Sequence, residues 1–332
     1  MLRPRHLLVS LLAPALGAVA VVGAPTASPE EPYGRPGVQV FRAGSWWNTP
    51  LPANTPKHRN AAAILTYLRT AEQAKGGCLR LAGTARNPWG QPVYWAGRGD
   101  RAYDVRTSMR RRPPELARLR IPANAAAAAT SDAAMTVFDT RKGYVVALTG
   151  AAYNRTSRTW SARGATVTYL ASNGLHVKTG RSDDRRNLGS HRGNNGATMM
   201  VRHDEVAAGA IKHVLKISSG PEVSTRSVFP MVNSDGDSTR AAAPPQGLRL
   251  RLKPSVNLRA MGLGRTARVI ARAIQTYGVY IGDSGGTTSL KLENTRAEGR
   301  GQLWRVRADA LCSLPFRSAL WDVLPEGYSR SR

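Results

Sequence analysis

Residues 135–149 read MTVFDTRKGYVVALT: two short apolar runs, Met135–Asp139 and Tyr144–Thr149, joined by a polar segment that ends in Gly143. Apolar runs of about four to eight residues between Gly, Pro, Asn or Asp are typical of β-strands. Similar runs recur along the chain, at 92–96, 102–106, 165–171, 197–201, 213–217, 248–252, 279–282 and 289–293. The sequence therefore predicts a mostly-β protein.

Helical spacing of apolar residues is found in few places. It predicts helices at 60–74, 204–208 and 266–277. Many short strands with few helices favour a β-sandwich or jelly-roll-like fold over alternating βαβ units. We expect a single β-rich globular domain at 38–332 with a few peripheral helices, preceded by a Pro/Gly linker at 28–37.

The first 27 residues have the three-part layout of a secretory signal peptide. Arg3 and Arg5 precede an apolar run at 7–22, and small residues follow at 23–27. The apolar run is shorter than the roughly 20 residues that a membrane-spanning helix needs. We expect cleavage and a secreted protein without membrane association, and an uncleaved membrane anchor is the alternative.

The chain has two cysteines, Cys78 and Cys312. In the oxidising environment outside the cell, the simplest interpretation is one disulfide bond between them. Two buried free thiols are the alternative, because the sequence does not show that the residues lie close together.

The formal net charge is +27, which would attract polyanions such as an anionic cell-wall polymer. The basic residues are spread along the chain, and the longest uninterrupted basic run is 110–112. A dispersed charge argues against a specific nucleic-acid interface. We expect a monomer that has neither a cofactor nor a bound metal.

A long polar connection at 172–196 is a candidate for the functional site, since long loops inside compact domains are usually functional or mobile. Its candidate base or charge stabiliser is His191, and its candidate substrate-binding residues are Arg192, Asn194 and Asn195. These side chains can bind sugar hydroxyls or neutralise a carboxylate during elimination. A solvated surface loop is the alternative.

Carboxylates are scarce, and three of them adjoin predicted strands. Asp132, Asp235 and Asp283 are the candidate catalytic carboxyl groups, because glycoside hydrolysis needs two carboxyl groups across one cleft. Aspartates in such contexts also form ordinary turns. The segment 233–238 resembles a calcium-binding loop but lacks the closing glutamate of an EF-hand.

Tryptophan residues concentrate in the first part of the predicted domain. Trp46, Trp89 and Trp95 are candidate platforms on which sugar rings could stack. Packing in the core is the commoner fate of a tryptophan.

The segment Gly282–Gly286 reads GDSGG, which matches the nucleophile motif of chymotrypsin-like serine proteases. A protease also needs a histidine base and a buried aspartate, and no histidine here has the sequence context of that family. A serine protease is therefore a minor alternative.

Several segments, including FRAGSWWNTPLP at 41–52, NPWGQPVYW at 87–95 and FPMVNSDG at 229–236, resemble a group of secreted actinobacterial proteins of unassigned function. The resemblance covers nearly the whole predicted domain and implies export and a single domain. The leading hypothesis is a secreted enzyme that degrades an extracellular polysaccharide by hydrolysis or lyase-type elimination. The alternative is a non-catalytic protein that binds the cell wall or a glycan.

Overall fold

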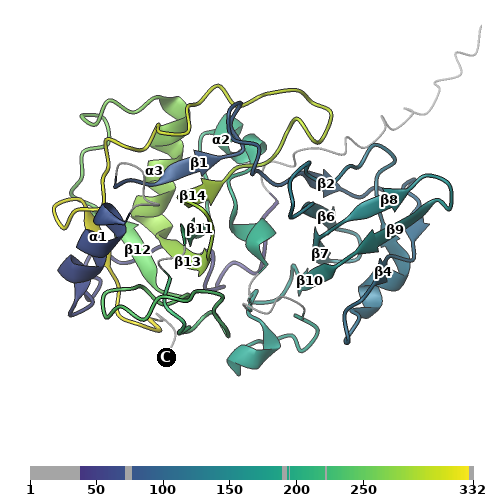
Figure 1. Ribbon diagram of the computed structural model, residues 1–332, viewed down its shortest axis with the longest axis horizontal. Helices are drawn as coiled ribbons and strands as arrows, with labels where there is room; N and C mark the ends of the chain where they lie inside the picture. Colours follow the sequence, from purple (N-terminus) through teal and green to yellow (C-terminus); the bar gives the residue numbers. More distant parts are fainter. Residues whose placement is uncertain (1–37, 72–76, 189–192, 194, 221–222, 329–332) are drawn as a thin grey trace, which may run out of the picture. The chain divides into compact units, whose positions relative to one another are not determined.

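The largest sheet of the computed structural model has six strands in the order β1-β14-β11-β13-β12-β15 (Figure 1). The strands are β1 (Arg80–Ala82), β14 (Thr288–Lys291), β11 (Leu215–Ser219), β13 (Val279–Asp283), β12 (Arg249–Leu252) and β15 (Trp321–Val323). The pairs β1/β14 and β11/β13 are parallel, and the other three pairs are antiparallel.

The structure describes residues 38–71, 77–188, 193, 195–220 and 223–328. The predicted signal peptide (1–27) and linker (28–37) lie outside this range, as do His191, Arg192 and Asn194. No helix within the described ranges is both long and apolar enough to cross a membrane.

The two faces of the six-stranded sheet differ in chemistry. One face carries Leu81, Ile217, Ile281 and Leu290, which are buried in the largest apolar core. The helix α3 (Arg265–Tyr277) packs on this core through Ile270 and Ile274. Because side chains alternate along a strand, the residues between these apolar positions project from the opposite face. That second face is largely polar.

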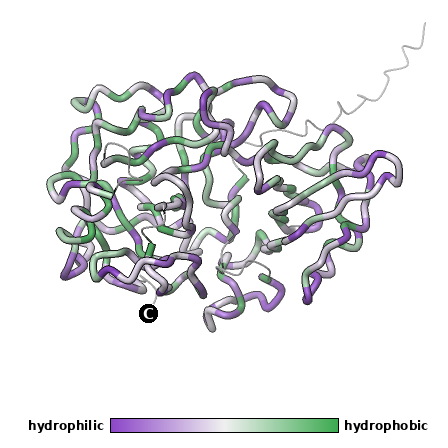
Figure 2. The backbone as a smooth tube through the Cα atoms, in the orientation of Figure 1, coloured by the Kyte–Doolittle hydropathy of each residue, from purple (hydrophilic) through white to green (hydrophobic). Residues whose placement is uncertain are grey.

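A second sheet has four strands in the order β10-β7-β6-β2. The strands are β10 (Gly164–Tyr169), β7 (Tyr144–Thr149), β6 (Met135–Asp139) and β2 (Val93–Trp95). The two apolar runs at 135–149 do form an antiparallel pair, β6 and β7, and this prediction is confirmed. Figure 2 shows apolar segments along the strands of both large sheets.

The four-stranded sheet packs apolar side chains on both of its faces. Val137, Val146 and Leu148 pack on one side with Trp160. Trp95 and Phe138 face the other side, where they join a core that also contains Tyr280 of the six-stranded sheet. This shared core holds the two large sheets together.

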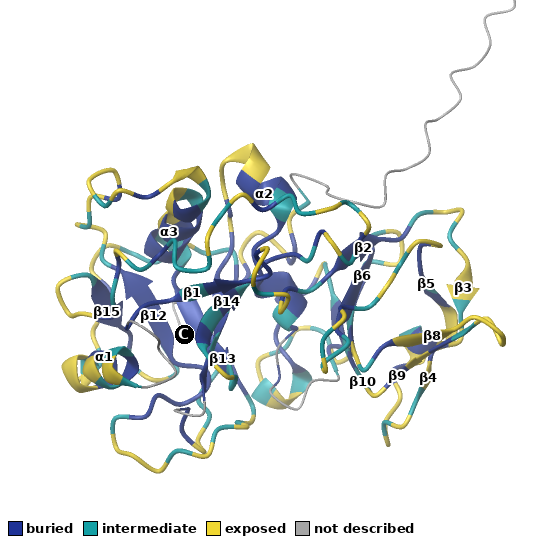
Figure 3. Ribbon diagram, turned by 45° about the horizontal axis from the view of Figure 1, so that its top comes forward, coloured by how far each residue is buried: buried dark blue, intermediate teal, exposed yellow. Residues whose placement is uncertain are grey.

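Smaller elements complete the domain, and the residues that the structure describes belong to one compact unit. β3 (Ala102–Tyr103) pairs with β5 (Leu119–Arg120), and β4 (Arg106–Thr107), β9 (Thr159–Ala162) and β8 (Ala152–Asn154) form a three-stranded sheet. β8 is exposed along its whole length (Figure 3). The remaining helices are α1 (Ala61–Thr70), α2 (His203–Ala208) and the 3-10 helices η2 (Pro114–Arg118), η3 (Val177–Thr179) and η4 (Gly196–Met199).

The structure confirms a mostly-β domain with few helices, and the strands are divided among several sheets. It also confirms the disulfide bond between Cys78 and Cys312, whose Cα atoms are 5.0 Å apart. Two strand predictions differ from the structure. Residues 196–199 form the 3-10 helix η4, although Val201 does make a parallel bridge to Leu292. The strand predicted at 102–106 is divided into β3 and β4, which belong to different sheets.

Candidate functional site

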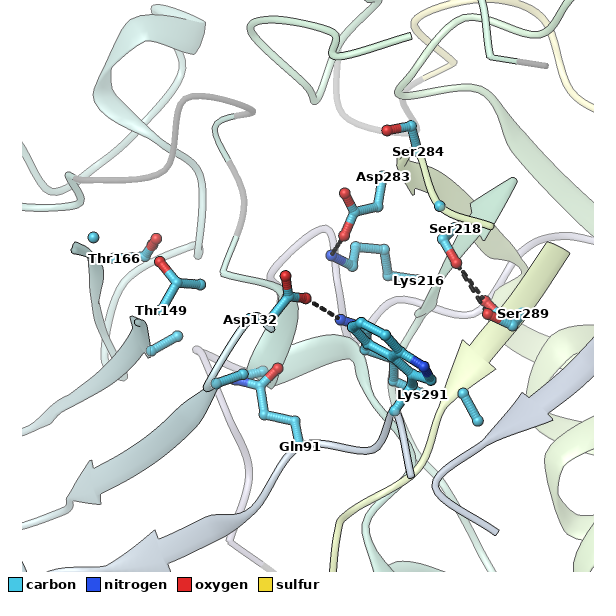
Figure 4. A pocket seen from close by; sticks show the side chains of 18 of the residues that line it. Gln91, Asp132, Thr149, Thr166, Lys216, Ser218, Asp283, Ser284, Ser289 and Lys291 are labelled. Atoms are coloured by element: carbon cyan, nitrogen blue, oxygen red, sulfur yellow. Dashed lines mark hydrogen bonds and ion pairs between the residues drawn. The ribbon is translucent and has the colours of Figure 1, made fainter. Parts of the chain in front are cut away.

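A cavity of about 670 Å³ lies between the two large sheets (Figure 4). The four-stranded sheet contributes the end of β7 and the start of β10, and the six-stranded sheet contributes β11, β14 and the loop after β13. The polar and aromatic side chains that line the cavity are Asn87, Trp89, Gln91, Asp132, Thr149, Thr166, Lys216, Ser218, Asp283, Ser284, Thr287, Ser289 and Lys291.

The polar face of the six-stranded sheet forms one wall of this cavity. Ser218 of β11 is paired in register with Ser289 of the antiparallel strand β14. Their hydroxyl oxygens are 3.0 Å apart and form a hydrogen bond. Lys216 and Lys291 lie two residues from these serines, so strand alternation sets both lysines on the same wall.

Two of the predicted catalytic carboxylates reach the cavity, and each is paired with a lysine (Figure 4). The Oδ2 atom of Asp283 is 3.4 Å from Nζ of Lys216, and Oδ2 of Asp132 is 3.6 Å from Nζ of Lys291. Asp283 ends β13, whereas Asp132 precedes β6. The two sheets therefore bring together carboxylates that are far apart in sequence.

Glycine at position 282 makes room for one of these ion pairs. A Cβ atom on Gly282 would be 2.7 Å from both Cγ and Cδ of Lys216. The Lys216 side chain thus crosses β13 directly over the glycine on its way to Asp283. Any larger residue would displace it.

Asp235, the third predicted carboxylate, is not among the residues that line the cavity. Its Oδ1 atom accepts a hydrogen bond of 3.1 Å from the backbone N–H of Ser284, and it also accepts one from the Gln246 side chain. Asp235 therefore holds the loop after β13 in place from behind the cavity wall.

The three predicted tryptophan platforms have different positions. Trp89 lines the cavity and is 43% exposed, so its ring is accessible to a ligand. Trp46 contacts Phe229 edge-on and donates a hydrogen bond to the Tyr280 hydroxyl. Trp95 is 2% exposed and stacks on Phe138, with ring centroids 4.3 Å apart. Trp95 is a core residue because both faces of its ring are covered, and the structure does not place it in the cavity.

Asn195 is also buried, at 3% exposure. Its side-chain amide donates to the Val145 carbonyl oxygen at 3.4 Å and to the Thr168 hydroxyl at 3.3 Å. These bonds tie the segment before η4 to β7 and β10, and Gly196 and Ala197 follow directly in the cavity lining. Asn195 itself is not among the residues that line the cavity, and its hydrogen bonds position the wall. His191, Arg192 and Asn194 lie outside the described residues.

No histidine lines the cavity among the residues that the structure describes. His176 is buried, and burial lowers its pKa to about 4. His213 contacts Glu205 at 3.0 Å, and the His203 ring contacts Trp304. Ser284 of the GDSGG segment does line the cavity, but no described histidine accompanies it as a base.

A buried pair of glutamates lies close to this wall. Arg300 Nη1 donates to Glu293 at 2.8 Å and to Glu298 at 2.9 Å, and Glu298 also accepts from the backbone N–H of Val93 in β2. Burial, reinforced by the neighbouring Glu293, raises the pKa of Glu298 to about 9. Glu298 is therefore protonated at neutral pH, and the cluster ties β2 to the segment after β14.

The sequence analysis missed Lys216, Ser218, Ser289 and Lys291. The signal was present as strict alternation, since LKIS at 215–218 and SLKL at 289–292 place polar residues on one face of each strand. In the described ranges, no group of three or more His, Cys, Asp or Glu side chains is arranged to hold a metal ion.

Compared with protein-family models, curated proteins and solved structures, the chain matches none of them.

Proposed function

We propose that the protein is secreted and cleaves an extracellular polysaccharide bound in the cavity between the two large sheets. The observation that carries this proposal is that Asp132, in the turn before β6, and Asp283, at the end of β13, line one cavity with an accessible tryptophan ring, Trp89. A polar wall of serine, threonine and amide side chains suits a ligand rich in hydroxyl groups, and an indole face suits stacking on a sugar ring.

Two reactions fit these residues. In hydrolysis, one carboxyl group protonates the glycosidic oxygen and the other activates water or attacks the sugar. In elimination, a base removes the proton next to a sugar carboxylate, the glycosidic C–O bond breaks, and a carbon–carbon double bond forms. Asp132 and Asp283 are the proposed proton-transferring groups in either case. His191 stays a predicted base.

A second candidate is a glycan-binding protein without catalytic activity. The observation that favours it is the ion pairing of both carboxylates with lysines. Carboxylates held in this way can serve as fixed acceptors for sugar hydroxyls.

A panel of neutral and acidic polysaccharides separates these possibilities. Hydrolysis and elimination both release new reducing ends, but only elimination produces unsaturated ends that absorb ultraviolet light. Asp132→Asn and Asp283→Asn should each lower the rate by about a hundredfold or more, which is the usual contribution of a positioned acid or base.

Asp104→Asn is the matched control, because Asp104 is exposed on the surface, does not line the cavity, and pairs with Arg112. Product formation that continues unchanged in both cavity variants would refute the assignment of Asp132 and Asp283. Retention on a polymer without any product would favour the binding protein.

A further inference from the structure

The two lysines of the cavity wall face each other across neighbouring strands. Ile217 pairs with Leu290, and Ser218 pairs with Ser289, in the antiparallel register of β11 and β14. Continuing this register by one residue sets Lys216 opposite Lys291. The wall thus presents two ammonium groups beside two serine hydroxyls (Figure 4).

Like charges directly opposite each other on a sheet oppose folding. On the reverse face of the same strands, Ile217 and Leu290 pack in the apolar core. Asp283 and Asp132 balance the two charges, but they come from outside β11 and β14. The two lysines line a cavity and are not part of the apolar core, and this position points to a ligand.

The two ion pairs differ in their exposure. The Lys216 and Asp283 side chains are 13% and 17% exposed, whereas Lys291 and Asp132 are 26% and 46% exposed. The Lys291 side chain is the more exposed of the two lysines, and its 3.6 Å contact with Asp132 is longer than a charge-assisted hydrogen bond. An incoming anion can thus approach Lys291 with little loss of an existing bond.

The charge of the whole chain points in the same direction. A net charge of +27 attracts polyanions to the protein, and an acidic polymer is one of them. A carboxylate on a sugar ring combines one negative charge with hydroxyls that the serines can bind.

We propose that the ligand of this cavity is an acidic polysaccharide, whose sugar carboxylate is bound by Lys291 with support from Lys216. This inference rests on the proposed function and narrows it to uronate polymers. Lys291 is then a specificity-determining residue, and loss of its ammonium group should reduce the preference for the charged polymer.

Polygalacturonate and its methyl ester test the inference, because they share a backbone and differ in charge. Binding is measured at about 0.15 M salt, where weak surface attraction is screened. The wild-type protein should bind the acid form at least about tenfold more tightly than the ester, as expected for one charge-assisted hydrogen bond. Lys291→Gln should lose this preference, and Lys291→Arg should keep most of it.

Two further variants make the result specific. Lys291→Gln combined with Asp132→Asn removes both partners of the ion pair at constant net charge, and it should also lose the preference. A restored preference in this double variant would show that Lys291 only neutralises Asp132, and it would overturn the inference. Lys142→Gln, which removes an exposed cation outside the cavity lining, should bind like the wild type.

The remaining outcomes distinguish the two proposals. Equal binding or cleavage of the acid and ester forms would agree with the proposed function but would refute the proposal that the ligand is acidic. Binding to a poly(glycerol phosphate) but to no uronate polymer would refute the proposal that the bound group is a carboxylate. An absence of binding and of cleavage with every polysaccharide would refute the proposed function itself.

Discussion

Gly282 illustrates how one residue controls the cavity. Its missing side chain allows Lys216 to cross β13, and Lys216 then reaches Asp283. A side chain at this position meets flexible methylene groups of Lys216 and the terminal methyl group of Met231 at 3.1 Å. Substitution should therefore disturb the site more than the fold.

We expect Gly282→Ala to abolish most of the function while lowering the free energy of unfolding by about 1–3 kcal/mol, which is typical of overpacking. Urea unfolding and the polysaccharide assay measure the two effects. Gly286→Ala is the matched control, because nothing lies within 4 Å of a Cβ atom there and Gly286 lines the same cavity. The control should change stability by less than about 0.5 kcal/mol. Equal effects of the two substitutions on function would contradict this account.

Among the elements, the segment that follows β14 links the two large sheets. It carries Glu293 and Glu298, which are 2% and 1% exposed, and their shared partner Arg300. Glu298 binds the backbone of β2, so the segment reaches from the six-stranded to the four-stranded sheet. The cavity between the sheets depends on this connection.

The raised pKa of Glu298 predicts a pH dependence of stability. Between its ordinary value near 4.5 and about 9, the folded protein binds this proton and the unfolded chain releases it. The free energy of unfolding should therefore fall as the pH rises through this window.

Glu298→Gln mimics the protonated acid and should flatten this slope. At pH 5 it should lower the free energy of unfolding by about 1 kcal/mol, because the amide replaces an acceptor of Arg300. Near pH 9 it should equal or exceed the wild type in stability. Urea unfolding at several pH values measures the free energy of unfolding of the wild type and of the variant. If this free energy has the same pH dependence in both proteins, Glu298 does not bind a proton in the folded state.

At the scale of the whole molecule, the disulfide bond joins residues that are 234 positions apart. Cys78 precedes β1 at one edge of the six-stranded sheet, and Cys312 lies in the segment that leads to β15 at the other edge. The bond therefore closes almost the whole described domain into one covalent loop.

Replacing both cysteines by serine should lower the free energy of unfolding by about 2–5 kcal/mol, as is usual for the loss of a native disulfide. Reduction of the wild-type protein should lower its thermal unfolding temperature to that of the double variant. A double variant as stable as the wild type would indicate that the bond does not form in the wild-type protein.

The sequence by itself determined the elements whose signals are local. The short apolar runs at 135–149 predicted β6 and β7, the helical spacing at 266–277 matches α3, and the two cysteines left one possible pairing. Asp283 at the end of a strand was also identified from its neighbours alone. These features depend on side-chain periodicity and backbone preferences, which act over a few residues.

Only the tertiary structure decided which side chains share the cavity. Trp89 and Trp95 are six residues apart, yet one is exposed in the cavity and the other is stacked in the core. The facing lysines depend on the register between β11 and β14, strands separated by about 70 residues, and on Asp132 from the other sheet. Strand order and register are set by long-range packing, so the local pattern shows that Lys216 and Lys291 leave the core face without showing what they meet.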